Sequence, residues 1–470
     1  MPPAALRKSP SRDRSAAIFV LPSEVQNLKK VLIMAIAILM LASCARGGGD
    51  ATKGVSHQRE SSVSTESEAP VTETVPATES ETEPPEEPIP PEAERWLSTS
   101  DDPDAVIMTE SDIASENERM RSESDTVVSF SDFGESISGG ELTAMLNRLG
   151  ESGLPKYTSG GREVTQDEYY ATLGLRGLDT VERENRVWRG IVTRRADMRR
   201  LPCDMPYFEA PGDLYDTLQL TEVPAFSPIL VLYVSTDGEF VLAQAYNYFG
   251  WISAGAVAVT DDDALWLSFA EPTEFLTVTD ARLKVGDVIC DMGVRLPLEK
   301  RDGDGYTVSV PLRDSGGMLI SGREYVSAHG VRRGYLPFTY RNFISQAFKY
   351  AGTEYSWGGR GGGVDCSGFV LNVMSTFGFR LPRDTGEQCR TVGSHDDLRA
   401  LSPHETAVRL AGVHFPTAVY YRGHTLLYLG YDPSDGSFHF IHAPRIGESV
   451  SLTSKYDLSG MTYICTFGDI

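Results

Sequence analysis

Residues 358–373 read GGRGGGVDCSGFVLNV, and this stretch decides how the C-terminal part of the chain folds. Five glycines surround one arginine, and Cys366 then opens a segment whose apolar residues recur at helical spacing. Phe369, Val370 and Val373 share one face, which predicts a buried helix that begins at the cysteine. Three interpretations of Cys366 follow: a nucleophile, a small buried residue in a tight turn, or part of a phosphate-binding loop.

The phosphate-binding interpretation fails on the residues that follow the glycines. A phosphate-binding loop of this length requires a lysine followed by serine or threonine, whereas this chain has Val364 and Asp365. The carboxylate of Asp365 would also repel a phosphate. A dinucleotide-binding fold is not expected either, because no strand of a parallel unit precedes the glycines.

A nucleophilic cysteine needs a lowered thiol pKa, an imidazole within reach and a group that orients the imidazole. The first turn of a helix is expected to lower the pKa of Cys366, because the helix dipole and the free backbone N–H groups favour the thiolate. The same N–H groups can receive an oxyanion. A buried structural cysteine would fit this helix start equally well. The two interpretations are therefore distinguished by whether histidines can come within reach of Cys366.

Two of the eight histidines are expected to meet on one hairpin. Residues 432–436, DPSDG, predict a turn, and folding the flanking strands about Ser434 makes His442 the diagonal neighbour of His424, about 7–8 Å away on the same face. His439 falls on the opposite face. The pattern therefore predicts Cys366, His424 and His442 as a catalytic group.

Four short motifs around these residues resemble a known family. The chain reads YSWGG at 355–359, DCSG at 365–368, HTLLYLG at 424–430 and IHA at 441–443. In this order they resemble the NlpC-like cell-wall cysteine peptidases, over about residue 338 to the C-terminus. The resemblance implies an α+β, papain-like domain at 336–470, similar to that of the γ-D-glutamyl-L-diamino acid endopeptidases with two SH3-like modules.

The resemblance also implies a role for each site residue. Cys366 attacks the carbonyl of the γ-D-glutamyl bond, His424 takes and returns the proton, and His442 orients His424. Tyr355 lies beside the nucleophile and helps to hold the oxyanion, and no cofactor is expected. Contacts with the stem peptide are implied for Trp357, Asp365, Ser367, Asp384 and Thr385, and Tyr246 or Tyr248 of the first SH3-like module is implied to read a free N-terminal L-Ala.

One stretch departs from the family pattern. Residues 415–419 read FPTAV where the family usually has Gly-Asp-Leu before the histidine strand. The spacing between Cys366 and His424 is also generous. We therefore expect a loop near residues 396–413 that reshapes the cleft.

Two units of short strands and Asp-Gly turns precede this domain, at 188–262 and 263–335. Such a pattern predicts small antiparallel barrels, and WRGIVT at 188–193 resembles the paired bacterial SH3-like modules of exported cell-wall enzymes. Residues 302–305, DGDG, predict a hairpin turn rather than a calcium loop, because the later glutamate ligand is missing. Residues 126–187 predict a short mixed region that packs on this body.

The first 44 residues predict export. Two lysines precede the apolar run 31–42, which is too short to span a bilayer and is typical of a signal peptide. The ending LASC resembles the bacterial lipoprotein box, which implies a lipid on Cys44 and anchoring to the outer face of the bacterial cell membrane, facing the wall. An ordinary signal peptide that ends near a cysteine is the alternative. Residues 45–125, rich in Ser, Thr, Glu and Pro, predict a disordered tether.

The charge of the chain argues against nucleic acid as a partner. Of the net charge of −23, residues 51–130 carry twenty Asp or Glu against five Lys or Arg, and no basic face follows. The six cysteines form no C-x-x-C pair, so zinc is unsupported. Four of them are buried singly or paired: Cys203, Cys290, Cys389 and Cys465.

Three functional hypotheses remain. The first is a monomeric, lipid-anchored peptidase that cleaves peptidoglycan stem peptides. The second is an amidase or acyltransferase on the same papain-like scaffold, and the third is an inactive protein whose modules bind the wall. Intact Cys366, His424 and His442 argue against the third.

Overall fold

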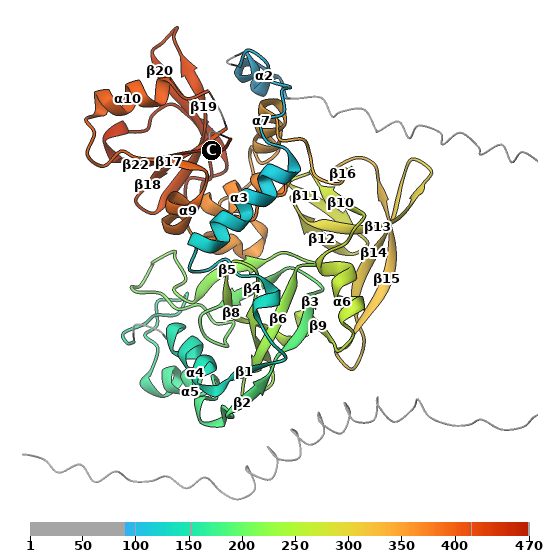
Figure 1. The fold of residues 1–470 in the computed structure, drawn as a ribbon. Coiled ribbons are helices and arrows are strands. Elements are labelled where there is room, and N and C mark those ends of the chain that lie inside the picture. Colours follow the sequence, from blue (N-terminus) through green and yellow to red (C-terminus); the bar gives the residue numbers. More distant parts are fainter. Residues whose placement is uncertain (1–89, 99, 151–152, 415, 469–470) are drawn as a thin grey trace, which may run out of the picture. The chain divides into compact units, whose positions relative to one another are not determined.

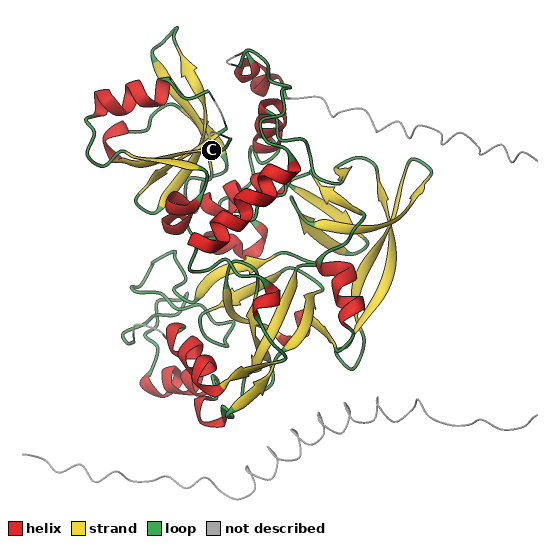
Figure 2. Ribbon diagram, viewed as in Figure 1, coloured by secondary structure: helices red, strands yellow, loops and turns green. Residues whose placement is uncertain are grey.

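The computed structural model describes residues 90–98, 100–150, 153–414 and 416–468 (Figure 1). The predicted signal peptide, its lipidation site Cys44 and the tether up to residue 89 lie outside the described residues. Within the described part, no helix combines the length and the apolar character needed to cross a membrane. The expected α+β class is confirmed, with antiparallel sheets and separate helices (Figure 2).

The predicted tether extends too far along the chain. Two helices form before its expected end at residue 125: α2 (Pro91–Leu97) and α3 (Glu110–Glu123). Trp96 of α2 and Met120 of α3 are buried in the core of the C-terminal unit. The acidic composition of the whole segment led to the prediction of disorder. The few apolar side chains nevertheless stabilise both helices by packing against the rest of the protein.

The mixed region after α3 packs on the first β unit. Its elements are η1 (Phe130–Asp132), β1 (Ser136–Ser138), α4 (Gly139–Arg148), α5 (Gln166–Gly174), η2 (Leu178–Thr180) and β2 (Glu184–Arg186). Leu142 and Leu146 of α4 are fully buried in one cluster with Trp251. The apolar face of α4 therefore covers the first β unit.

The first β unit is a seven-stranded antiparallel sheet with the order β5-β4-β8-β7-β6-β3-β9. Its strands are β3 (Trp188–Val192), β4 (Ala196–Arg199), β5 (Gln219–Val223), β6 (Pro228–Val234), β7 (Phe240–Gln244), β8 (Phe249–Ser253) and β9 (Val257–Thr260). Short strands and tight turns produce the antiparallel barrel-like pattern that the sequence predicts.

The second β unit contains a five-stranded sheet with the order β15-β14-β13-β10-β16 and a separate hairpin β11-β12. Its elements are α6 (Asp263–Ala270), β10 (Phe275–Val278), β11 (Arg282–Val285), β12 (Val288–Asp291), β13 (Arg295–Asp302), β14 (Gly305–Arg313), β15 (Leu319–Ser327) and β16 (Val331–Arg333). Asp302 pairs with Gly305, so the stretch DGDG is the predicted hairpin turn.

The C-terminal unit combines helices with a six-stranded antiparallel sheet of order β17-β22-β18-β19-β20-β21. Its helices are α7 (Tyr340–Phe348), η4 (Trp357–Gly362), α8 (Cys366–Ser375), α9 (Thr385–Thr391), α10 (Pro403–Ala411) and η5 (Leu458–Gly460). Its strands are β17 (Ser394–Asp397), β18 (Thr417–Tyr421), β19 (His424–Asp432), β20 (Ser437–His442), β21 (Ser451–Thr453) and β22 (Met461–Thr466).

The core of this unit fixes the start of α8. Helix α8 lies between α7 and β19, and its Phe369 and Val373 are fully buried beside Phe343 of α7. Thr339 caps α7, because its side chain accepts a hydrogen bond from the Asn342 backbone N–H. Figure 1 shows α3 alongside these helices, although α3 comes from the N-terminal part of the chain.

The prediction of a loop near residues 396–413 is wrong. This segment holds the end of β17 and helix α10, whose start carries Pro403 at the first position and a capping box between Ser402 and Glu405. Such a pattern is a helix-start signal that the sequence already contained. All five cysteines among the described residues are free thiols: Cys203, Cys290, Cys366, Cys389 and Cys465.

Candidate active site

The glycine-rich segment brings the chain close to β5 before it turns into α8. Gly358 has φ 60°, and a Cβ at this position would lie 2.8 Å from Gln219 Cγ, so a side chain is excluded there. Asp365 caps α8, because its Oδ1 accepts a hydrogen bond from the Gly368 backbone N–H at 2.8 Å. Cys366 is therefore the first residue of the helix, as predicted.

The thiol of Cys366 is buried. The residue is 6% exposed, and the backbone N–H groups of Thr425 and Ser367 act to lower its pKa. Burial, together with the charge of Asp365, nevertheless raises the pKa of the thiol to about 12. The expected lowering of this pKa is wrong, because desolvation of a thiolate outweighs the N–H groups at the helix start.

Strands β19 and β20 bring His424 and His442 together. Leu427 pairs with Ile441, which is the register that folding about Ser434 predicts. The two rings lean toward each other, so that His424 Nε2 lies 2.9 Å from His442 Nδ1. This contact confirms the expected proximity of the two histidines.

His439 occupies a different environment. It follows a register shift in the β19–β20 pairing, and its ring centroid lies 4.8 Å from that of Trp96 in α2. The structure therefore separates His439 from the pair, as the alternation of strand side chains predicts.

Both imidazoles of the pair are neutral. Burial lowers the pKa of His424 to about 4. Burial also lowers the pKa of His442 to about 4, with a further contribution from the neighbouring His424. Because Nε2 of His424 faces His442, Nδ1 is the nitrogen left to take a proton from Cys366.

Tyr456 joins this pair, and sequence reasoning missed it. Its hydroxyl lies 3.2 Å from His442 Nδ1, and its ring stacks on His424 with an interplanar angle of 17°. Tyr456 lies in an irregular segment after β21, where no strand or helix period predicts a side-chain direction. The only available signal was an aromatic residue within reach of the hairpin that carries the histidines.

The structure places Tyr355 close to Cys366 and leaves Trp357 half-exposed. Burial, with Cys366 and Asp365 close by, raises the pKa of Tyr355 well above its usual range, so this phenol remains a hydrogen-bond donor. Trp357 is 40% exposed, and its indole N–H donates to the backbone oxygen of Asp216 at 3.2 Å. The ring of Tyr215 lies 5.2 Å from that of Trp357, so an aromatic pair joins the first β unit to the glycine-rich segment.

Arg383 is a second residue that sequence reasoning left without a role. Its guanidinium is buried and donates to Asp365 Oδ2 at 2.5 Å and to Ser367 Oγ at 2.8 Å. Its Nε donates to Thr221 Oγ1 of β5 at 2.7 Å. Arg383 thus ties both residues that flank Cys366 to the first β unit. Asp365 and Ser367, predicted to contact substrate, already have protein partners here.

Tyr248 and Asp384 meet across the same junction. The Tyr248 hydroxyl donates to Asp384 Oδ2 at 3.0 Å, and Asp384 directly precedes Thr385, the first residue of α9. Tyr246 instead donates to the backbone oxygen of Leu381 at 3.3 Å. Burial raises the pKa of Asp384 above its usual value.

A cavity adjoins this junction. It measures about 220 Å³, and its lining includes Tyr248, Asp365 and Arg383 together with residues of both β units. Three of the side chains that were predicted to contact substrate, those of Tyr246, Tyr248 and Asp365, therefore border this cavity, whose lining does not include Cys366, His424 or His442.

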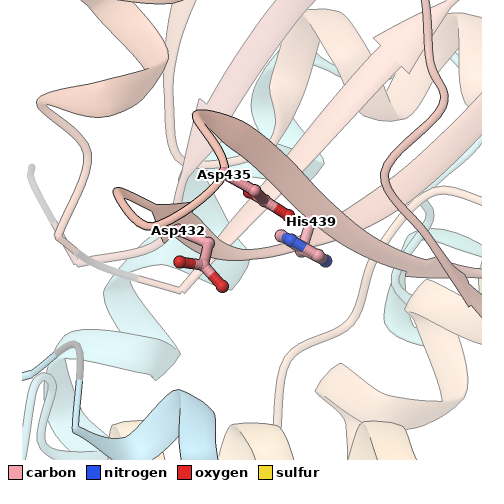
Figure 3. Close-up of side chains that lie close together, drawn as sticks. All are labelled: Asp432, Asp435 and His439. Carbon is pink, nitrogen blue, oxygen red and sulfur yellow. The ribbon is translucent and has the colours of Figure 1, made fainter.

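One group of side chains among the described residues has the spacing of metal ligands. Asp432, Asp435 and His439 offer atoms within 4.8 Å of one another at the tip of the β19–β20 hairpin (Figure 3). Each already has a protein partner. Asp432 pairs with Arg95 at 2.9 Å, Asp435 Oδ1 accepts from the Ser437 backbone N–H at 3.0 Å, and His439 Nε2 lies 2.7 Å from Ser437 Oγ. The group lies at the far end of the strands from His424 and takes no part in the Cys366 site.

Comparison with known proteins identifies two domains. Residues 352–464 match the NlpC/P60 family, and residues 206–253 match the SH3 domain of SH3b1 type. The fold resembles that of a solved structure of an NlpC/P60 endopeptidase from Photobacterium damselae subsp. piscicida. The TM-score is 0.65 at 20% identity, over 80% of this chain and 96% of the other.

Two curated relatives are bacterial enzymes. Both carry the name γ-D-glutamyl-L-lysine dipeptidyl-peptidase. The protein of Bacillus subtilis (strain 168) is 26% identical over 127 residues, which cover 24% of this chain and 35% of the relative. The protein of Bacillus cereus (strain ATCC 10987 / NRS 248) is 26% identical over 189 residues, which cover 39% and 50%. The chain thus spans half or less of the length of the curated relatives it matches.

Proposed function

Residues 352–464 belong to the NlpC/P60 family of cysteine peptidases, and we propose that this protein hydrolyses the bond between γ-D-glutamate and a diamino acid in peptidoglycan peptides. One observation carries the proposal: Cys366 begins α8, which packs on β19, and Nε2 of His424 on β19 lies 2.9 Å from Nδ1 of His442 on β20. The names of the two bacterial relatives support this choice of bond.

The reaction uses Cys366 as nucleophile and His424 as acid and base. The thiol proton moves to His424 Nδ1 while the sulfur attacks the γ-carbonyl carbon, and the carbonyl oxygen becomes an oxyanion. The tetrahedral intermediate collapses to a thioester, and His424 returns the proton to the departing amine of the diamino acid. A water molecule, deprotonated by His424, then hydrolyses the thioester and regenerates the thiol.

Proton transfer and attack are coupled in this scheme. The thiol has a raised pKa of about 12 and His424 a lowered pKa of about 4, so the resting pair is neutral. An imidazolium forms only as the sulfur bonds to carbon, and the hydrogen bond of His424 Nε2 to His442 stabilises it at that moment.

The phenol of Tyr355 is the proposed donor to the oxyanion. Because burial keeps it protonated, it can offer a hydrogen bond in a region where water is scarce. The free backbone N–H groups in the first turn of α8 also stabilise the oxyanion.

The proposed substrate has a free N-terminal L-Ala. Asp384, paired with Tyr248 of the first β unit, supplies a carboxylate that can bind the ammonium group. Thr385 and the half-exposed Trp357 are also proposed to contact the peptide. Asp365 and Ser367 are both hydrogen-bonded to Arg383, and they act either through this residue or by direct contact with the peptide backbone.

Export and lipid anchoring complete the proposal. The signal-like residues 1–44 and the lipoprotein-box ending at Cys44 support a position on the outer face of the bacterial cell membrane, where stem peptides are the available substrates. Metabolic labelling with palmitate tests this: label is expected on the full chain, and its presence on a Cys44→Ala variant would contradict the assignment.

The test of the reaction is peptide hydrolysis followed by mass spectrometry. L-Ala-γ-D-Glu-diaminopimelate and its lysine counterpart are expected to release the free diamino acid, and Cys366→Ala is expected to release none. N-acetylation of L-Ala should raise KM about tenfold or more, because the ion pair with Asp384 is lost.

The same assay separates the competing functions. Acyl transfer to an added amine without hydrolysis would indicate an acyltransferase. Binding of the peptides by the wild type without turnover would indicate a wall-binding protein. Release of ammonia from an amidated peptide, with the γ-D-glutamyl bond intact, would indicate an amidase.

A further inference from the structure

Tyr456 is the aromatic centre of the histidine site. Its ring lies 5.9 Å from His424 in a stacked arrangement, 5.1 Å from His442 edge-on and 5.2 Å from Tyr421. The hydroxyl lies 3.2 Å from His442 Nδ1, the same nitrogen that faces His424 Nε2 at 2.9 Å. Two potential donors therefore converge on one imidazole nitrogen.

The proton on this nitrogen decides whether His424 can act as a base. If His442 Nδ1 is unprotonated, it accepts from His424 Nε2–H, which leaves the lone pair of His424 at Nδ1. If His442 Nδ1 carries the proton, it donates to His424 Nε2, and His424 Nδ1 then bears a hydrogen. In that tautomer His424 cannot take a proton from Cys366 through Nδ1.

The phenol favours the first arrangement. A phenol is a stronger hydrogen-bond donor than acceptor, so it gains most from an unprotonated His442 Nδ1. Burial, with Cys366 nearby, raises the pKa of Tyr456 to about 12, and the hydroxyl keeps its proton throughout the neutral range. The other charged groups that act on this cluster are Glu448, which acts on His442 and Tyr456, and Arg445, which acts on Tyr456.

We propose that Tyr456 is a positioning residue whose hydroxyl holds His442 in the tautomer with Nδ1 unprotonated, so that His424 presents Nδ1 to the thiol of Cys366. Its role in turnover rests on the proposed peptidase reaction. Its stacked ring also fixes the plane of His424, so the hydroxyl and the ring make separable contributions.

Tyr456→Phe removes the hydroxyl and keeps the ring. The expected result is a decrease in kcat of about tenfold with KM changed less than about twofold, because one hydrogen bond to the catalytic pair is lost. The acid limb of the pH profile should move to higher pH by about half a unit or more, since the neutral form of His442 loses a donor that stabilises it.

Tyr421→Phe is the matched control. The Tyr421 ring packs on Tyr456, but within the described part of the chain its buried hydroxyl has no hydrogen-bond partner. This variant should keep both kcat and the acid limb of the wild type. Equal effects of the two substitutions, or an unchanged kcat and acid limb in Tyr456→Phe, would overturn the proposal.

Nuclear magnetic resonance of nitrogen-labelled histidine reads the tautomer without substrate. Wild-type His442 should show an unprotonated Nδ1, and Tyr456→Phe should shift population toward the Nδ1–H form. A protonated Nδ1 in the wild type overturns the proposal, whether or not the variant folds. If the wild type shows the expected tautomer but cleaves no peptidoglycan peptide, the proposed function fails and the assignment of the hydroxyl stands.

Discussion

Arg383→Met tests whether one buried guanidinium connects the nucleophile to the first β unit. Arg383 is 7% exposed and Asp365 6% exposed, so methionine would leave a carboxylate buried without its cation. It would also leave the Thr221 and Ser367 hydroxyls without the donors that they now have. Methionine fills most of the volume, so the main loss is electrostatic.

The expected cost follows from the burial of both partners. Removal of one member of a buried ion pair costs about 3–5 kcal/mol, because the remaining charge stays desolvated. Asp365→Asn removes that charge and preserves the cap of α8, since asparagine caps helices as well as aspartate. The double variant should therefore be more stable than the sum of the single variants by about 2 kcal/mol.

The assay is urea denaturation followed by tryptophan fluorescence for the wild type, both single variants and the double variant. Thr221→Val is the partner-side control, and it should cost about 1.5–3 kcal/mol because it removes an acceptor of a charged donor. An unchanged urea midpoint in Arg383→Met, or strictly additive effects of the two substitutions, would refute the reasoning.

Three further outcomes are expected. Trp96→Ala should lower stability by about 3–5 kcal/mol in thermal or urea denaturation, because Trp96 is 2% exposed in the core shared with α7; an unchanged midpoint would exclude α2 from that core. Alkylation of Cys366 by iodoacetamide, followed by peptide mass spectrometry, should accelerate from about pH 7 to about pH 10 without a plateau, as for a thiol of pKa about 12; a plateau near neutral pH would reveal a preformed thiolate. The pKa of His442 falls from 6.5 to about 4 on folding, so the unfolded chain binds its proton first, and the wild type should lose stability relative to His442→Gln as the pH falls from 6.5 to about 4. This expectation would be contradicted if the free energies of unfolding of the two proteins, measured by urea titration at each pH, changed in parallel. The comparison cancels the opposite effect of Glu222, whose pKa burial raises to about 8.

Most of the fold and the central residues of the site could be predicted from local sequence patterns. Folding the strands about the DPSDG turn predicted the pairing of Leu427 with Ile441, and the alternation of side chains along β20 distinguished His442 from His439. The pairs nearest the turn are shifted by one residue, and the irregularity between Tyr428 and Gly430 restores the predicted register. The helix that begins at Cys366 followed from the spacing of its apolar residues. These features depend on neighbours a few residues away, which the sequence displays directly.

Features that depend on tertiary packing were not accessible in the same way. Tyr456 and Arg383 contact residues outside their own local segments, and no hydrophobic periodicity in the sequence points to either side chain. The pKa of Cys366 was predicted in the wrong direction because helix position can be inferred from sequence, whereas burial of the sulfur cannot. Helix α2 was assigned to the tether for a similar reason, since its Trp96 is stabilised by distant partners.

The placement of α2 and α3 has a consequence for how the chain assembles. Their buried residues share a core with residues from Phe338 onward, while the whole of both β units lies between them in sequence. A chain that emerges N-terminus first must therefore hold Trp96 and Met120 unpacked until its last segment arrives, which slows folding and exposes apolar surface to aggregation. Expression of the C-terminal unit from residue 336 alone would leave the surface that packs against α2 and α3 uncovered for the same topological reason.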